Sequence, residues 1–500
     1  MKYFLQSAYA TIFAFWKTIL CNFENKVSKN GYKLILKLLT FSSLLLITAI
    51  ILPFVVYRIL IWIYLKLKHK NDFLKIFNFI PSSYFMMDGD YATMKIFLLI
   101  ESEDGDTIER KAQDFCKAMC ENVPEVTGVV KRISGYYYLL KNRYIFDDFF
   151  MSVSFNDGML LTKEKLGSYV TNCAVTNQRL FKIVFFKEPL EKNRYAILFL
   201  LHHGISDGHG VWLLMYKYLC DKESIPSQNN LLVPRQQTNF NDPYIDTKTL
   251  TYVANHNEPS ICKGPYFAIF VEEEISCVPK LKALRKRFNC SMNELFLGII
   301  TYNLYRNMNE SLDNIPNNML MGYIHHFLSD YQKDFRNMFF PRTDISNNTY
   351  LMAFLAENIT SCSCIEDFIE CVREKSQEAI KSVILQGSYA LSLGVLDFLP
   401  KNWLHNFIIR QVSRSILFFS NVGITKGITV GGKRIVGILG GMSPGGSGIC
   451  TGVVTCNDRL NIMLSTKLPI FNSQDEVQHF MESCIASIHE LYEKVTSYSY

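Results

Sequence analysis

RYAILFLLHHGISDGHGVWLLMYKYLC, residues 194–220, joins an apolar strand pattern to a glycine-rich turn and a helix. The seven apolar or aromatic residues 195–201 predict a strand that is buried on both faces, and the glycines from Gly204 to Gly210 predict a tight turn. His202, His203 and Asp207 therefore lie where a rigid strand ends, a place that can hold catalytic side chains in register with a substrate.

Strand and helix patterns alternate on both sides of this turn and predict an α/β fold with two lobes. The first lobe is assigned to residues 72–225, a linker to 226–250 and the second lobe to 251–500. Strands are expected at 91–100, 136–140, 151–155, 180–186, 195–201, 320–324, 350–355, 417–422, 449–456 and 461–466. Helices are expected at 106–120, 280–288, 365–385 and 474–493, and Ser291 with Glu294 forms a capping-box pattern. A ligand site is expected in the cleft between the lobes.

The composition is that of a folded protein with sizeable cores. Of the 500 residues, 49% are hydrophobic and 14% are aromatic, and the net charge of +6 includes no strong basic block that would indicate nucleic acid. The 14 cysteines include no pair of CxxC motifs, so zinc is not expected and reduced thiols facing the cytosol are favoured.

The N-terminal region predicts contact with a membrane. Residues 1–37 form an N-terminal segment whose apolar part, 1–21, is broken by Lys17 and is interpreted as an interfacial helix rather than a signal peptide or first membrane segment. Residues 38–57 are uncharged and long enough to cross a bilayer, and the transmembrane anchor is placed at 38–65. Arg58 is expected to snorkel to the headgroups, and Pro53 leaves a kinked helix or a tight hairpin open.

His202 and His203 allow three interpretations. A neutral imidazole can remove a proton from an alcohol that attacks an acyl carbon. An ordinary structural pair of histidines is about as well supported by the spacing alone. A metal site made of His202, His203, His209 and Asp207 is disfavoured, because adjacent histidines seldom point at one ion.

HHGISDG resembles the HHxxxDG motif of the superfamily that includes chloramphenicol acetyltransferase, plant alcohol acyltransferases and peptide-synthetase condensation domains. The wax ester synthase/diacylglycerol acyltransferase family is the best match, over about residues 80–495. Four weaker segments occur in the order of that family: Ile145-Phe146-Asp147, Ser291–Leu295, Ser346-Asn347-Asn348 and Phe419–Val422. The resemblance implies two chloramphenicol-acetyltransferase-like lobes with a cleft or tunnel between them.

Some positions depart from the family pattern. Arg179-Leu180-Phe181 replaces a Pro-Leu-Trp segment, and Asn293-Glu294 replaces Asn-Asp, so the roles of both segments are open. The Asp-Phe-Gly-Trp-Gly motif of plant enzymes is absent, and His325–Asp330 imitates the main motif in the wrong lobe without its final glycine.

The resemblance implies acyl transfer from acyl-CoA, as a co-substrate with no bound cofactor, to a fatty alcohol or diacylglycerol. His203 would be the general base, and His202, Asp207 and Gly208 would support the motif. Asn421 and Asn293 are candidates for an oxyanion or substrate contact, and Gly440–Gly448 is either a crossover loop or a close approach to pantetheine. Another acyltransferase of the superfamily acting on a non-lipid alcohol or amine, and a non-catalytic lipid-binding protein, are the alternatives.

The expected location is the endoplasmic reticulum membrane, crossed once, with the catalytic body in the cytosol. Cytosolic acyl-CoA and the many lone cysteines favour that side, whereas the sequons at Asn289, Asn309, Asn347 and Asn358 would matter only on the lumenal side.

Overall fold

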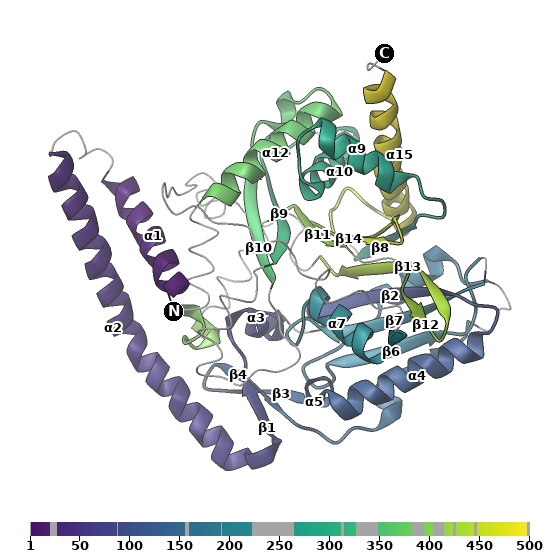
Figure 1. Cartoon of the computed structure of the whole chain (residues 1–500), viewed down its shortest axis with the longest axis horizontal. Helices are drawn as coiled ribbons and strands as arrows, with labels where there is room; N and C mark the ends of the chain where they lie inside the picture. The colour runs from purple at the N-terminus through teal and green to yellow at the C-terminus, as the bar shows by residue number, and fades with distance from the viewer. Residues whose placement is uncertain are drawn as a thin grey trace.

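Two six-stranded sheets lie face to face between layers of helices in this computed structural model (Figure 1), which confirms the predicted α/β architecture. The structure describes residues 2–20, 28–87, 89–155, 160–191, 193–222, 265–311, 315–326, 349–382, 395–403, 415–423, 427–444 and 448–497. The predicted linker at 226–250 lies outside the described residues.

The first sheet has the strand order β12-β13-β2-β7-β6-β5. Its strands are β12 (Thr429–Val430), β13 (Lys433–Met442), β2 (Thr93–Glu101), β7 (Arg194–His202), β6 (Phe181–Phe186) and β5 (Phe150–Val153). Alternate residues of β2 face opposite sides, so Ile96 and Leu98 pack under the helices α4 (Gly105–Asn122) and α7 (Gly208–Tyr218), while Phe97 and Leu99 face the other lobe.

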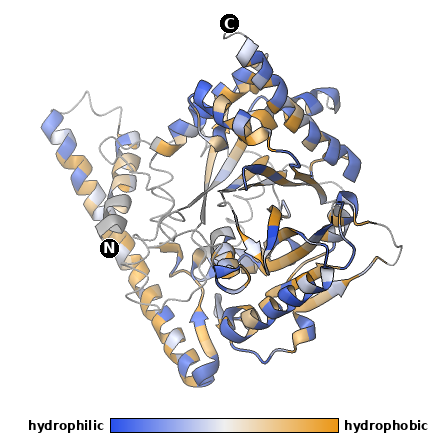
Figure 2. Cartoon of the chain, turned by 45° about the vertical axis from the view of Figure 1, so that its right-hand side comes forward, coloured by the Kyte–Doolittle hydropathy of each residue, from blue (hydrophilic) through white to orange (hydrophobic). Residues whose placement is uncertain are grey.

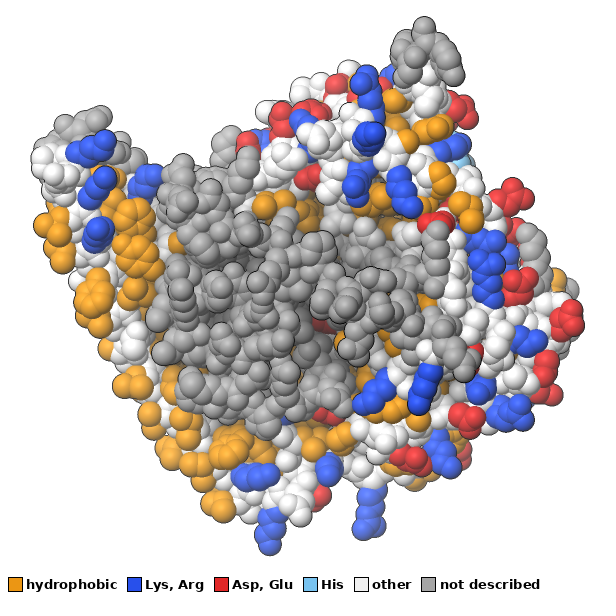
Figure 3. Space-filling view, viewed as in Figure 1, with side chains coloured by type: hydrophobic (Ala, Val, Ile, Leu, Met, Phe, Trp, Pro, Cys, Tyr) orange, Lys and Arg blue, Asp and Glu red, His pale blue; other side chains and the backbone are white. Residues whose placement is uncertain are grey.

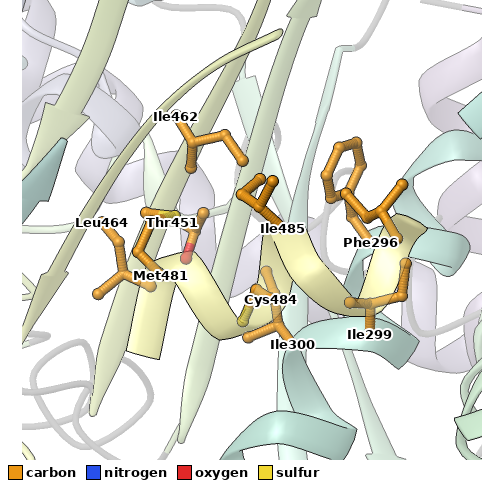
Figure 4. A pocket seen from close by; sticks show the side chains of 10 residues that line it. Phe296, Ile299, Ile300, Thr451, Ile462, Leu464, Met481, Cys484 and Ile485 are labelled. Atoms are coloured by element: carbon orange, nitrogen blue, oxygen red, sulfur yellow. The ribbon is translucent and has the colours of Figure 1, made fainter. Parts of the chain in front are cut away.

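The second sheet has the order β10-β9-β11-β14-β15-β8. Its strands are β10 (Thr349–Ala356), β9 (Met319–His326), β11 (Leu417–Gly423), β14 (Ile449–Cys456), β15 (Arg459–Thr466) and β8 (Tyr266–Val271). The helices α9 (Cys277–Arg287), α10 (Met292–Ser311), α12 (Ile365–Lys381) and α15 (Gln474–Ser497) share its core. A small apolar pocket between this sheet, α10 and α15 is lined by residues such as Phe296, Thr451 and Cys484 (Figure 4).

The assignment of residues 251–500 to one lobe was wrong for β12 and β13, which complete the first sheet. β13 pairs antiparallel with β2, from Ile435 opposite Ile100 to Met442 opposite Met94. The boundary at residue 251 followed the order of elements in the sequence. The backbone N–H and C=O groups on the outer side of β2, however, form their hydrogen bonds with β13, which returns from the later part of the chain. Gly440 and Gly441 are therefore strand residues, and residues 445–447 of the predicted glycine-rich loop lie outside the described residues.

The two N-terminal helices pack against each other. α1 (Lys2–Ile19) lies along the first half of α2 (Lys29–His69) (Figure 1). Trp16 Nε1 on α1 donates to Ser43 Oγ on α2 at 2.9 Å. α2 is one helix through Pro53, so the hairpin alternative over 38–65 was wrong. By length and composition, it is the one described helix that is long and apolar enough to cross a membrane.

Most of α2 consists of hydrophobic residues (Figure 2), and apolar side chains cover its outer edge (Figure 3). Its 41 residues measure about 60 Å at 1.5 Å per residue, twice the thickness of a hydrocarbon core. The far end packs on the protein body: Ile61 and Leu65 contact the small sheet of β1 (Phe73–Ile76), β4 (Tyr136–Leu140) and β3 (Val129–Ile133).

The expectation that Arg58 reaches lipid headgroups was wrong. Only 1% of Arg58 is exposed, and its guanidinium donates to Asp397 O, to Phe77 O at 3.2 Å and to Asn78 Oδ1 at 2.9 Å. Carbonyl oxygens of the protein body accept these hydrogen bonds, so the guanidinium is buried and not in contact with solvent. Helix α2 is thereby fixed to the body at Arg58.

Candidate functional site

The end of β7 is held by both neighbouring strand segments. The His202 backbone N–H donates to Leu180 O at 2.8 Å, and the His203 N–H donates to Ala92 O at 2.6 Å. Leu180 belongs to the segment whose role the sequence left open, and here its carbonyl fixes the position of His202. These bonds place the two histidines where the sheet gives way to α7.

Asp207 and Gly208 shape the turn that follows. Asp207 is the N-cap of α7, and its Oδ1 accepts the Gly210 N–H at 2.8 Å. Only 1% of Asp207 is exposed, and Gly208 is the first residue of α7. Such a cap satisfies a backbone donor at the helix start and favours a negative charge there. The structure thus brings all four motif residues together.

His202 is a neutral, fully buried side chain that holds the turn. Its Nδ1 accepts the Gly204 N–H at 3.0 Å, and its ring stacks on Phe85 with centroids 4.6 Å apart. Burial, with a smaller contribution from His203, lowers the pKa of His202 to about 3. Because Nδ1 accepts a hydrogen bond, the neutral ring carries its proton on Nε2.

His203 lies against an aromatic ring and is 7% exposed. Its imidazole stacks on Tyr84 with centroids 4.0 Å apart and an interplanar angle of 2°. Burial lowers the pKa of His203, and the charge of Asp207 partly opposes this effect. His203 therefore stays neutral down to a lower pH than an ordinary histidine does, and in its neutral form it can accept a proton.

Sequence reasoning missed helix α3 (Phe79–Met87), which supplies both stacking rings. Burial, then Asp207 and Cys450, raises the pKa of Tyr84, so its hydroxyl stays protonated beside the site. The sequence FIPSSYFMM has no helical polar face that would have separated it from a strand or loop. The signal in the sequence that could have pointed to this helix is the aromatic pair Tyr84 and Phe85 shortly before β2.

The two candidate asparagines form a second group in the other lobe. Asn421 Nδ2 on β11 donates to Asn293 Oδ1 near the start of α10 at 3.1 Å. Glu294 is occupied by the predicted capping box, since its carboxylate accepts the Ser291 N–H at 2.5 Å and its own N–H donates to Ser291 Oγ at 3.2 Å. Glu294 therefore acts as part of the cap at the start of α10.

Strand β14 connects the two groups. Cys450 of β14 contributes to the raised pKa of Tyr84, so this strand comes near the histidine turn. Asn421 pairs with Val453, three residues further along β14, which corresponds to about 10 Å. The asparagine pair therefore lies three residues along β14 from Cys450, the residue that acts on Tyr84.

The other segments that the sequence singled out have no described contact with the histidine turn. Asp147 is exposed in a 3₁₀ turn (Phe146–Asp148), and its neighbour Asp148 forms an ion pair with Arg179 at 2.6 Å. His325 and His326 are the last two residues of β9. Ser346–Asn348 lies outside the described residues.

Comparison with solved structures identifies the fold. A wax ester synthase/diacylglycerol acyltransferase from Marinobacter aquaeolei VT8 aligns with a TM-score of 0.54 and 12% identity, over 84% of this chain and 100% of that chain. Trichothecene 15-O-acetyltransferase from Fusarium sporotrichioides gives a TM-score of 0.54 and 12% identity, over 81% and 93%. The first condensation domain of the CDA synthetase gives 0.54 and 9%, over 84% and 97%.

The chain has the chloramphenicol-acetyltransferase-like fold. No protein-family model matches the sequence, and no curated protein matches it significantly. The fold resemblance predicted from HHGISDG is confirmed by structures that share only 9–12% of its residues. In this fold the histidine turn holds a buried imidazole with a lowered pKa next to an aspartate that caps a helix.

Proposed function

We propose that the protein is a membrane-anchored O-acyltransferase that transfers a long-chain acyl group from acyl-CoA to a fatty alcohol or diacylglycerol. The observation that carries the proposal is His203, a buried imidazole with a lowered pKa at the end of a rigid strand. The shared fold of the wax ester synthase/diacylglycerol acyltransferase and the acetyltransferase supports it.

In the proposed reaction the neutral ring of His203 accepts the hydroxyl proton of the alcohol while the oxygen attacks the thioester carbon. The tetrahedral oxyanion then collapses, the carbon–sulfur bond breaks, and the leaving thiolate takes the proton back from the imidazolium. The ester and free CoA are the products, and His203 returns to its neutral form. No other cofactor is required by this balance.

The oxyanion needs hydrogen-bond donors that are already in position. The Asn293 side chain accepts from Asn421 through Oδ1, and that bond does not use the two N–H donors of its own amide. We assign Asn293 and Asn421 to a contact with the oxyanion or the substrate. His202 and Asp207 act on the shape of the turn and not on the reacting atoms.

Helix α2 supports a membrane location for the enzyme. Long-chain acyl donors and acceptors partition into lipid, so an anchor places the enzyme in the phase of its substrates. We propose a single crossing near residues 38–57 in the endoplasmic reticulum membrane, with α1 against α2 and the body in the cytosol.

The experiment measures labelled ester formation from acyl-CoA by full-length wild type, His203→Ala and His479→Ala in detergent or vesicles. His479 is an exposed histidine of α15 and serves as the matched control. Loss of activity in His203→Ala alone supports the base, and equal activity in all three would overturn it. A panel of fatty alcohols, diacylglycerol and short polar alcohols or amines identifies the acceptor.

Two further measurements test the location. Resistance to alkaline extraction is expected for an anchored protein, and its loss on deletion of residues 1–57 would assign the anchor to this region. An endoglycosidase-sensitive mass shift on the native protein would place the body in the lumen and contradict the cytosolic assignment.

A further inference from the structure

Three buried polar or charged side chains meet where α2 joins the body. Arg58, Asp397 and Lys401 are 1%, 4% and 0% exposed, and Arg58 and Asp397 are 339 residues apart in the sequence. Burying charge costs several kcal/mol per ion unless hydrogen bonds replace the lost water. None of the three takes part in the proposed chemistry.

These groups are joined by hydrogen bonds to one another and to the start of α3. Lys401 Nζ donates to Leu396 O and to Asp397 O, the second at 3.1 Å, and Arg58 donates to the same Asp397 carbonyl. Asp397 Oδ1 accepts the Phe79 N–H at 2.6 Å. Burial and the nearby Arg58 lower the pKa of Lys401, whereas Asp397 raises it.

The first residues of α3 are thus fixed from two sides. Arg58 holds Phe77 O and Asn78 Oδ1, and Asp397 caps the N–H of Phe79, the first residue of the helix. We name Arg58, Asn78 and Asp397 the α3 clamp. A terminus held this way leaves a nine-residue helix little freedom to shift.

The other end of α3 contacts both histidines. Tyr84 stacks on His203 and Phe85 stacks on His202, and the absence of a side chain at Gly204 makes room for Phe85, since a Cβ there would lie 2.5 Å from Phe85 Cζ. Arg58 is therefore connected to the imidazole of His203 through α3: it binds the residues before the start of the helix, and Tyr84 near the end of the helix stacks on His203.

We propose that Arg58 is a positioning residue: by fixing α3 it holds the Tyr84 ring on His203 and so makes the active turn depend on correct docking of helix α2. The inference rests on the proposed function only in taking His203 as the base. Its structural part concerns the exposure of His203 and is tested without substrate.

The substrate-free test measures the rate at which diethyl pyrocarbonate modifies His203 in full-length protein, by peptide mass spectrometry, with the exposed His479 as internal standard. In Arg58→Gln the rate at His203 is expected to rise about fivefold through local opening of α3, with His479 unchanged. Arg306→Gln, at an exposed arginine of α10, is the matched control and should leave both rates at wild-type values.

Asn78→Ala provides a milder variant in case Arg58→Gln does not fold. It removes one acceptor of the α3 clamp and keeps every charge, so a rise of about twofold is expected. An unchanged His203 rate in a folded Arg58→Gln protein, or in Asn78→Ala if the first variant is unfolded, overturns the inference.

Activity adds a second readout. His202 and Asp207 act on the charge of His203, and Tyr84, which stacks on His203, is itself near Asp207 and Cys450. Loosening α3 returns solvent to His203 and raises its pKa, so Arg58→Gln should lower kcat about tenfold with an unchanged KM and move the acidic limb of the pH profile upward. If wild type forms no ester but Arg58→Gln exposes His203, the proposed function fails and the positioning role stands.

Discussion

Tyr84 lies face to face with His203, with ring centroids 4.0 Å apart and planes 2° from parallel. The two residues come from different elements, one from α3 and the other from the end of β7. The contact fixes the plane of the imidazole and removes water from one of its faces. It explains how a histidine at a turn remains neutral and oriented.

Replacing Tyr84 tests the value of this contact. Tyr84→Ala is expected to lower kcat about tenfold, because the imidazole loses both its orientation and its burial. The pKa of His203 should rise toward its ordinary value, which shifts the acidic limb of the pH–rate profile to higher pH. Tyr84→Phe retains the ring and should keep the wild-type limb. Identical profiles for the Ala and Phe variants would contradict a stacking role.

His202 should make folding sensitive to acid. Its folded pKa of about 3 lies below that of an unfolded histidine, so between those values the unfolded chain binds the extra proton and stability falls as pH falls. The expected contribution is about 1.4 kcal/mol per pH unit below about pH 6.5. Denaturation of His202→Asn in detergent between pH 7 and 5 should show a correspondingly smaller loss than wild type. The exposed His479→Asn variant should retain the wild-type slope.

The bond between Asn293 and Asn421 predicts coupled mutations. A double-mutant cycle with Asn293→Ala and Asn421→Ala should show a coupling of about 1 kcal/mol, because either substitution removes the same hydrogen bond. If the pair also contacts the oxyanion, kcat will fall in each single variant while the pH profile stays unchanged. Additive losses in both stability and kcat would refute the pairing.

The crossing of β13 and β14 predicts opposite outcomes for two glycines. A Cβ at Gly452 would lie 1.7 Å from Gly440 O, so Gly452→Ala should prevent the two strands from packing and abolish folded protein. A Cβ at Gly440 has its nearest neighbour at 4.0 Å, so Gly440→Ala should fold. Expression and thermal unfolding compare the two variants, and equal tolerance would show that the strands do not approach this closely.

Much of the secondary structure could be predicted because its patterns are local. The strand at 195–201 became β7, the capping box at Ser291 starts α10, and the long apolar run lies inside α2. Turn chemistry also placed His202, His203, Asp207 and Gly208 together. Each of these features depends on residues that are close in sequence.

The missed features depend on partners far away in the chain. Nothing in FIPSSYFMM reveals that Tyr84 contacts His203, because the two residues are 119 positions apart in the sequence and meet only through tertiary packing. Arg58 looked like a snorkelling residue because the sequence does not show the carbonyl of Asp397, which binds it. The lobe boundary failed for the same reason, since β13 finds its partner β2 across more than 300 residues.

The late position of β13 in the chain has a consequence for biosynthesis. While the ribosome is still translating the middle of the chain, β2 has one edge without its final neighbour, and Thr93–Glu101 offers free backbone groups to any other strand. A nascent chain released before residue 442, or an isolated first half made in bacteria, should therefore aggregate through that edge. Chaperone protection would be needed until β13 has left the ribosome and paired with β2.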